Sequence, residues 1–276
     1  MTATIIDAPV AAEAAATPRR RPALGRTAQR AISVLTPVVI LVVWELLART
    51  GVIDERFYPA PTAIFSALWD QAASGELWEQ SAVSIGRLLV GIVLGTVPAV
   101  LIGVAMGLSR VVRAALKPLI SGLYPIPKSA VFPLFLLFFG LGEWTTYWFV
   151  AVGAFFPVVI NTAAGVANVS SVYYDVSDNF GASRWQVFRS VAIPGAMPSI
   201  ITGIELGAGM GLIMLSIAEM MGGAGSGWGF MVWNSFQLFA IDAMYAYLLV
   251  FAVVGFGVAM IVGAIGRKLT PWITRD

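Results

Sequence analysis

Six long apolar runs constrain this chain more than any other feature of its sequence. They cover residues 31–48, 82–108, 119–141, 145–167, 196–221 and 243–265. A helix crosses the roughly 30 Å apolar core of a bilayer with about 20 residues, and each run is close to that length or above it. The runs are apolar at odd and even positions alike, unlike the alternating strands of a membrane β-barrel. The sequence therefore predicts an all-α polytopic membrane protein with six transmembrane helices.

The composition agrees with this class and excludes several kinds of chemistry. Hydrophobic residues make up 58% of the 276 residues and charged residues only 12%, whereas soluble domains carry about 25% charged residues. The chain has no Cys and no His, so it lacks cysteine nucleophiles and the usual ligands of zinc, haem and iron–sulfur sites. We therefore expect no redox centre, no metal site and no catalytic residue, and we do not expect an enzyme.

The positions of the basic residues predict the orientation of the helices. Cytoplasmic segments of membrane proteins are enriched in Lys and Arg. Thirteen of the 17 basic residues fall in the N-terminal tail, the second and fourth connections and the C-terminus, which share one side of a six-helix protein. Both termini are therefore predicted to be cytoplasmic. Residues 1–30 are predicted to be a disordered tail and residues 31–276 the transmembrane domain, in contact with a lipid bilayer and not with nucleic acid.

The connection between the fourth and fifth apolar runs is longer than two neighbouring helices need. It reads YYDVSDNFGASRWQVFRSVAIPGAMP from Tyr173 to Pro198 and lies on the predicted cytoplasmic side. Gly181 interrupts it, and Ser183 is a suitable N-cap for a second helix. Two helices, 172–180 and 183–191, are thus predicted with a turn between them. Such a pair can present a rigid, partly apolar surface to a cytoplasmic partner.

This connection resembles the EAA loop of permeases of ATP-binding-cassette (ABC) importers. The family pattern is Glu-Ala-Ala, three residues, Gly, nine residues and Ile-x-Leu-Pro, and it falls here on Asp175, Val176, Ser177, Gly181, Val191, Ile193 and Pro194. Other segments resemble the nitrate, sulfonate and taurine branch: YPAPT, SIGRLLVGIVLG, PIP before FPLFLLFFGLGE, GAFFPVVINT, IPGAMPSIITGI and AEMMGGAGSGWGF. The likeness runs from about Tyr58 to the C-terminus. The triplet DVS departs from EAA, because β-branched Val176 stands where the family has a small alanine.

The resemblance implies a type I ABC importer permease in the bacterial cytoplasmic (inner) membrane. It implies that 172–194 is a coupling loop that docks on a cytoplasmic ABC ATPase, two copies of which hold ATP and Mg²⁺, so that this chain carries no cofactor. The other implied partners are a second copy of the chain and an extracytoplasmic solute-binding protein. The sequence contains no Gly-Lys dipeptide and hence no P-loop of its own. The residues expected to make the ATPase contact are Asp175, Val176, Ser177, Gly181, Ala182, Arg184 and Pro194.

Polar residues inside the apolar runs are candidates for the translocation path, because ionisable groups are costly in a bilayer. Lys128 could face the path and attract an anionic solute, or it could extend to the cytoplasmic headgroups. Glu219, at the external end of the fifth run, is expected to shape an external gate, whereas Glu205 could be structural. Asn161 is the fourth candidate, and Arg87 could pair with one of the acids.

Glycines at helical spacing leave two packing arrangements open. Small residues four apart let transmembrane helices approach closely, and they occur at Gly91/Gly95, Gly103/Gly107 and Gly203/Gly207/Gly211. The last set suits a symmetric dimer axis, as the family implies, and suits packing within one subunit equally well.

The functional prediction is the permease subunit of an ATP-driven importer of a small anionic solute of the sulfonate, taurine or nitrate type. One alternative is a cation-coupled secondary transporter in which Glu205 and Glu219 carry protons. Another is a membrane scaffold that transports nothing. The long fourth connection favours the importer, because a proton-coupled carrier has no need for a lever to a cytoplasmic ATPase.

Overall fold

A computed structural model describes residues 25–221 and 225–272, and the regular elements within these ranges are helices. Most of the predicted tail, residues 1–24, lies outside them. The helices that are long and apolar enough to cross a membrane are α1 (Arg26–Arg49), α3 (Glu76–Leu108), α6 (Glu143–Ala167), α9 (Ile193–Met221) and α11 (Ile241–Leu269). A bent pair, α4 (Arg110–Leu123) and α5 (Lys128–Phe139), makes a sixth span when counted as one. The predicted all-α, six-span architecture is confirmed.

The third span differs from the expected continuous helix over 119–141. Here α4 ends at Leu123, α5 begins at Lys128, and the two are bent by 101°. Pro125 and Pro127 explain the break, because proline donates no backbone hydrogen bond and disfavours helical dihedrals in the residue before it. The PIP sequence is the signal for this bend, and a count of apolar residues does not register it.

The α6 helix lies at the centre of the bundle, and α3 and α9 pack along it. Glycines permit this close approach. A Cβ atom at Gly103 would lie 2.6 Å from the Thr162 Cβ, and one at Gly207 would lie 2.8 Å from the Ala154 carbonyl oxygen. Gly203 and Gly211 also face α6. The glycines of the fifth span therefore serve packing within one subunit, and the dimer-axis interpretation of these positions is wrong.

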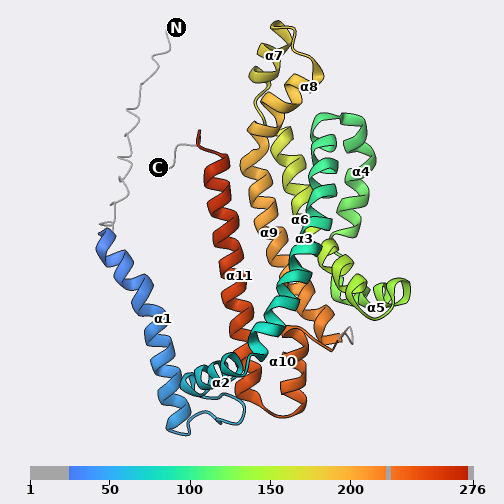
Figure 1. Cartoon of the computed structure of the whole chain (residues 1–276). Coiled ribbons are helices and arrows are strands. Elements are labelled where there is room, and N and C mark those ends of the chain that lie inside the picture. Colours follow the sequence, from blue (N-terminus) through green and yellow to red (C-terminus); the bar gives the residue numbers. More distant parts are fainter. Residues whose placement is uncertain (1–24, 222–224, 273–276) are drawn as a thin grey trace, which may run out of the picture.

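The two ends of the bundle differ in construction (Figure 1). At one end project α7 (Ser171–Asn179) and α8 (Arg184–Val187), and α1 begins and α11 finishes toward this same end. This is the cytoplasmic end of the predicted topology. At the external end, α2 (Pro61–Ser74) lies across the bundle beside α10 (Trp228–Gln237).

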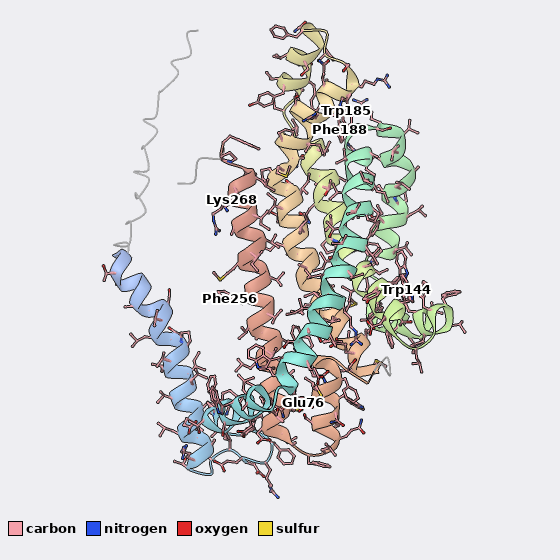
Figure 2. The ribbon with its side chains drawn as sticks, in the orientation of Figure 1. Glu76, Trp144, Trp185, Phe188, Phe256 and Lys268 are labelled. Atoms are coloured by element: carbon pink, nitrogen blue, oxygen red, sulfur yellow. The ribbon has the colours of Figure 1, made fainter. Side chains whose placement is uncertain are left out.

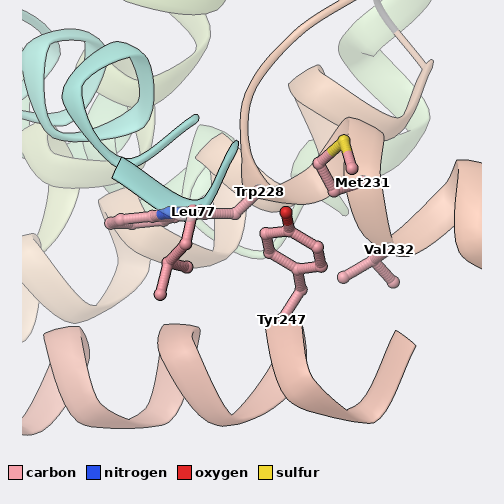
Figure 3. Close-up of a cluster of buried hydrophobic side chains, with 5 residues drawn as sticks. All are labelled: Leu77, Trp228, Met231, Val232 and Tyr247. Atoms are coloured by element: carbon pink, nitrogen blue, oxygen red, sulfur yellow. The ribbon is translucent and has the colours of Figure 1, made fainter. Parts of the chain in front are cut away.

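A buried apolar cluster joins the external helices to the spans. It consists of Leu77, Trp228, Met231, Val232 and Tyr247, contributed by α3, α10 and α11 (Figure 3). The indole nitrogen of Trp228 donates to the Ser81 hydroxyl at 3.0 Å, which satisfies the polar atom of an otherwise fully buried ring. The segment from Gly225 to Ile241 thus contains a short helix that is anchored on the bundle.

The first span is attached mainly near its external end. The ring centroids of Trp44 and Tyr245 are 6.0 Å apart. Glu45 accepts hydrogen bonds from the backbone nitrogen and hydroxyl of Thr62 at 3.0 and 2.8 Å. These contacts fix the corner between α1 and α2, while most apolar side chains along α1 are exposed.

Candidate functional site

The long fourth connection folds into two helices separated by a turn, as predicted. The α7 helix ends at Asn179, and Gly181 follows with a φ of 68°. Its backbone nitrogen donates to the Asp178 oxygen, and that of Ala182 donates to the Ser177 oxygen, both at 3.0 Å. These bonds close the last turn of the helix, and the left-handed dihedral favours glycine. Gly181 is therefore the point at which the chain reverses.

Ser183 caps the second helix, as predicted. Its hydroxyl accepts from the Gln186 backbone nitrogen at 3.3 Å, and the Gln186 side chain accepts from the Ser183 nitrogen at 2.7 Å. This reciprocal capping box starts α8 at Arg184. The helix does not stop near residue 191. It passes through a π-helical turn, η1 (Phe188–Ala192), directly into α9, so that residues Arg184–Met221 form one 38-residue helix.

The helix pair exposes large apolar side chains at the cytoplasmic end of the molecule. Phe180 is 86% exposed and Trp185 66% exposed, and Trp185 stacks on Phe188 with ring centroids 5.1 Å apart (Figure 2). Exposed apolar patches beyond a membrane domain are typical of protein interfaces. Tyr174, on the same helix pair, is half-buried instead of exposed. Its burial raises the pKa of the phenol, so the side chain stays neutral.

The seven residues predicted for ATPase contact all lie on this helix pair or directly after it. Asp175, Val176, Gly181 and Arg184 are exposed. Ser177 is half-buried, and its hydroxyl donates to the Tyr173 oxygen at 2.8 Å. Ala182 and Pro194 are half-buried as well, in the turn and in the first turn of α9.

A second site is a buried ion pair near the external end of the bundle. Nη1 of Arg87 in α3 lies 3.0 Å from Oε1 of Glu219 in α9, with the two side chains 2% and 0% exposed. Arg87 also binds Glu143 at the start of α6, with 2.6 Å between Nη2 and Oε1. The sequence-based expectation that Arg87 pairs with an intramembrane acid is confirmed, and Glu143 is a partner that the sequence did not indicate.

Further hydrogen bonds join this ion pair to the segment before α10. Glu219 accepts from the Ser84 hydroxyl at 2.7 Å and from the Gly229 nitrogen at 2.9 Å. Arg87 donates to the Ser226 carbonyl at 2.7 Å. A Cβ atom at Gly227 would fall against the Glu219 carboxylate, so the close approach requires glycine. We call Arg87, Glu143, Glu219, Ser84 and Ser226 the external network.

The external network bears on the idea that Glu219 carries protons. Its carboxylate is enclosed by an arginine, a hydroxyl and a backbone nitrogen. Such a carboxylate is held in place by its hydrogen bonds and its ion pair. The arrangement is that of a structural tie between α3, α6, α9 and α10, and residues 222–224 of the same motif lie outside the described part of the chain.

The other three candidates for the path lie apart from the external network and from one another. Lys128 stands at the break between α4 and α5, where its ammonium donates to the Leu123 and Tyr124 carbonyls. The Asn161 amide donates to the Pro157 carbonyl of its own helix at 2.8 Å. Glu205 is exposed in a groove between α9 and α11 that Thr202 and Arg267 also line. Within the described ranges, no group of acidic side chains is arranged to hold a metal ion.

Apolar spans, a cytoplasmic helix pair continuous with one span, and a tied external end define a membrane subunit of a transport system. A family model described as binding-protein-dependent transport system inner membrane component matches residues 91–274. The chain belongs to this family and is an inner-membrane protein.

Named relatives agree with this assignment. The chain is 34% identical to the taurine transport system permease protein TauC of Escherichia coli, over 88% of its own length and 90% of that protein. It is 34% identical to the putative aliphatic sulfonates transport permease protein SsuC of Bacillus subtilis, covering 86% of each chain. It is 27% identical to the nitrate import permease protein NrtB of Leptolyngbya laminosa, covering 90% and 91%.

The fold also has a counterpart among solved structures. A chain of the MetNI methionine ABC transporter, in an inward-facing conformation, superposes with a TM-score of 0.58 at 18% identity. The match covers 72% of this chain and 94% of that one. The fold is therefore that of an ABC importer permease, as predicted, and none of these comparisons favours the cation-coupled alternative.

Proposed function

We propose that this chain forms the membrane pathway of an ATP-driven importer of a small anionic solute of the sulfonate, taurine or nitrate type. The observation that carries the proposal is the continuous helix from Arg184 to Met221. It joins an exposed cytoplasmic surface to a transmembrane span without a flexible link. A push on the exposed surface is thereby passed to the span as rigid-body movement.

The same geometry and the family support a set of partners for this chain. The exposed apolar surface of α7 and α8 binds a cytoplasmic ABC ATPase, which holds ATP and Mg²⁺ and performs the hydrolysis. Two copies of the ATPase serve two copies of this chain, and an extracytoplasmic solute-binding protein delivers the solute. Asp175, Val176, Ser177, Gly181, Ala182, Arg184 and Pro194 form or position the ATPase contact.

An anionic solute is supported by two independent observations. Three relatives are named as permeases for taurine, aliphatic sulfonates and nitrate. Nitrate and aliphatic sulfonates are anions, and taurine is a zwitterion with a sulfonate group. The chain also has a lysine, Lys128, at the break in the third span, where a charge is costly unless it has a partner or faces water.

Substitution of Gly181 tests the coupling role. Gly181→Pro removes the backbone N–H that donates to the Asp178 oxygen and forces φ to negative values. We expect normal membrane insertion but loss of ATP-dependent uptake in proteoliposomes. We also expect that the ATPase no longer co-purifies with the variant. Gly181→Asn is the matched control, because asparagine tolerates the left-handed dihedral. Intact uptake and co-purification in Gly181→Pro would show that the coupling assignment is wrong.

The same preparation separates the alternatives. A proton-coupled carrier transports in liposomes of the lone protein under a proton gradient without ATP. A scaffold shows no ATP-dependent accumulation in the complete complex. The importer shows accumulation only with the ATPase, ATP and the binding protein present.

A further inference from the structure

Two hollows lie in succession along one face of α6. The hollow nearer the cytoplasmic surface, here called the outer hollow, has a volume of about 430 Å³ and opens between α4 and α6. It is lined by Lys117, Tyr124 and Ala164, among others. The inner hollow, about 160 Å³, lies beside the α4–α5 break and is lined by Val152 and Phe156, among others. The α6 residues that line them recur every three or four positions, so they share one helical face.

An aromatic pair separates the two hollows. Tyr124 lines the outer hollow and Phe156 the inner one, and their ring centroids are 6.1 Å apart. The Lys128 ammonium lies 5.1 Å from the Tyr124 centroid and 4.7 Å from the Phe156 centroid. One cation thus contacts both rings, which is the geometry of a cation–π interaction.

The charge in the two hollows has one sign. Arg113 and Lys117 line the outer hollow and Lys128 lines the inner one, whereas no acidic side chain is among the lining residues of either. Arg113 is partly engaged, since it donates to the Met106 carbonyl at 2.9 Å. A hollow lined by cations and apolar walls raises the local concentration of anions.

The backbone beside the hollows also requires water or protein around it. Residues 121–127 are exposed, and Pro125 and Pro127 interrupt the helix inside an apolar span. Non-helical backbone at membrane depth is tolerated only where it is buried in protein or lines a water-filled cavity. An aqueous route on this face of α6 satisfies that requirement, as does contact with another protein chain, whereas a lipid-facing surface does not.

We propose that the anionic solute crosses the cytoplasmic half of the membrane through these two hollows, and that Tyr124, Phe156 and Lys128 form the gate between them. This inference rests on the proposed function and adds to it a route and a gate. The α4–α5 bend lies next to Tyr124, so a change in this bend moves one ring away from the other. A solute anion that pairs with Lys128 competes with the rings for its ammonium and so favours opening.

The absence of cysteine from the chain makes the route directly testable. Single cysteines are introduced as Ala164→Cys in the outer hollow, Val152→Cys in the inner hollow, and Leu101→Cys at an exposed apolar position of α3 that lines neither. Inside-out membrane vesicles carrying the full chain are treated with two membrane-impermeant methanethiosulfonate reagents, one bearing a sulfonate and one a trimethylammonium group. The measurement is the modification rate of each cysteine.

We expect Ala164→Cys to react and Leu101→Cys not to react. At Ala164→Cys the sulfonate reagent is faster than the cationic one, on the order of tenfold, and Lys117→Gln removes the preference. Val152→Cys is slow, and it becomes as fast as Ala164→Cys when combined with Phe156→Ala. Tyr124→Ala is the second gate variant if Phe156→Ala inserts poorly.

Three results would overturn the proposal: Ala164→Cys as unreactive as Leu101→Cys, no preference for the anionic reagent, or no effect of either gate variant on Val152→Cys. Labelling needs neither ATPase nor solute, so these failures are independent of the transport assay. If wild-type uptake is ATP-dependent while the labelling pattern fails, the route alone is wrong. If wild-type uptake fails in the complete complex, the proposed function is wrong.

A transport measurement supplies the final arm. In the complete complex, Lys128→Gln is expected to lower anion uptake, whereas Lys268→Gln, an exposed lysine at the end of α11, is the matched control. Figure 2 shows Lys268 on the outer side of α11. Equal uptake by both variants would remove Lys128 from the gate.

Discussion

Arg87 shows how a buried charge is stabilised by its partners in this protein. Its guanidinium reaches two carboxylates and a carbonyl at once, and its planar fork holds the five donors in a fixed geometry that suits these partners. Removing one partner of such a pair leaves an uncompensated charge, and this costs about 3–5 kcal/mol. The external network therefore fixes where α3, α6 and α9 meet.

Substitution of Arg87 is expected to lower stability strongly. Arg87→Gln leaves Glu219 buried without a cation, so the thermal midpoint in detergent falls, with a loss of about 3–5 kcal/mol in unfolding free energy. Arg56→Gln is the control: Arg56 pairs with Asp54 on the surface, with 84% of its side chain exposed, and such pairs contribute about 0–1 kcal/mol. The double variant Arg87→Gln/Glu219→Gln should recover part of the loss. An equal midpoint for Arg87→Gln and Arg56→Gln would contradict the role of the network.

At the scale of helices, the positions of most spans can be predicted from the length of the apolar runs alone. The contacts between the spans cannot be predicted in this way. The apolar runs locate the spans because bilayer thickness sets helix length. Gly181 and Ser183 locate the turn between α7 and α8 because each has a specific backbone role. The bend between α4 and α5 is marked locally by the prolines of the PIP sequence. The facing of Gly207 onto α6, by contrast, depends on which helices are neighbours, and one sequence contains no such information. Glu143 as a partner of Arg87 was missed for the same reason.

Two glycines of α9 test the packing at the element scale. A Cβ at Gly207 would press on the Ala154 carbonyl oxygen at 2.8 Å, whereas one at Gly209, on the same helix, meets nothing within 4 Å. Gly207→Ala is expected to destabilise by about 1–3 kcal/mol through overpacking. Gly209→Ala is expected to be neutral or stabilising by up to about 1 kcal/mol, because alanine favours helix. Thermal midpoints in detergent check both, and a smaller loss at Gly207 than at Gly209 would refute the intra-subunit packing.

For the whole molecule, the proposed ATPase contact distinguishes between exposed aromatic side chains at the cytoplasmic end. Trp185 on α8 is 66% exposed, and Trp272, which follows the end of α11, is 56% exposed. The α11 helix finishes toward the same end of the molecule as α8 (Figure 1). The two residues have the same side chain and similar exposure, but only Trp185 belongs to the helix pair that continues into α9.

Trp185→Ser is therefore expected to weaken the association of the ATPase, and Trp272→Ser is not. A central aromatic residue of an interface contributes about 2 kcal/mol or more, which corresponds to a dissociation constant about 30-fold higher or more. Titration of purified ATPase onto the chain in nanodiscs measures this constant, and solute-stimulated ATP hydrolysis by the complete complex reports the coupling. Both variants should keep the thermal midpoint of the wild type, because both side chains are largely exposed. An equal loss of affinity in the two variants would mean that the ATPase docks on the cytoplasmic end in general, and not through α7 and α8.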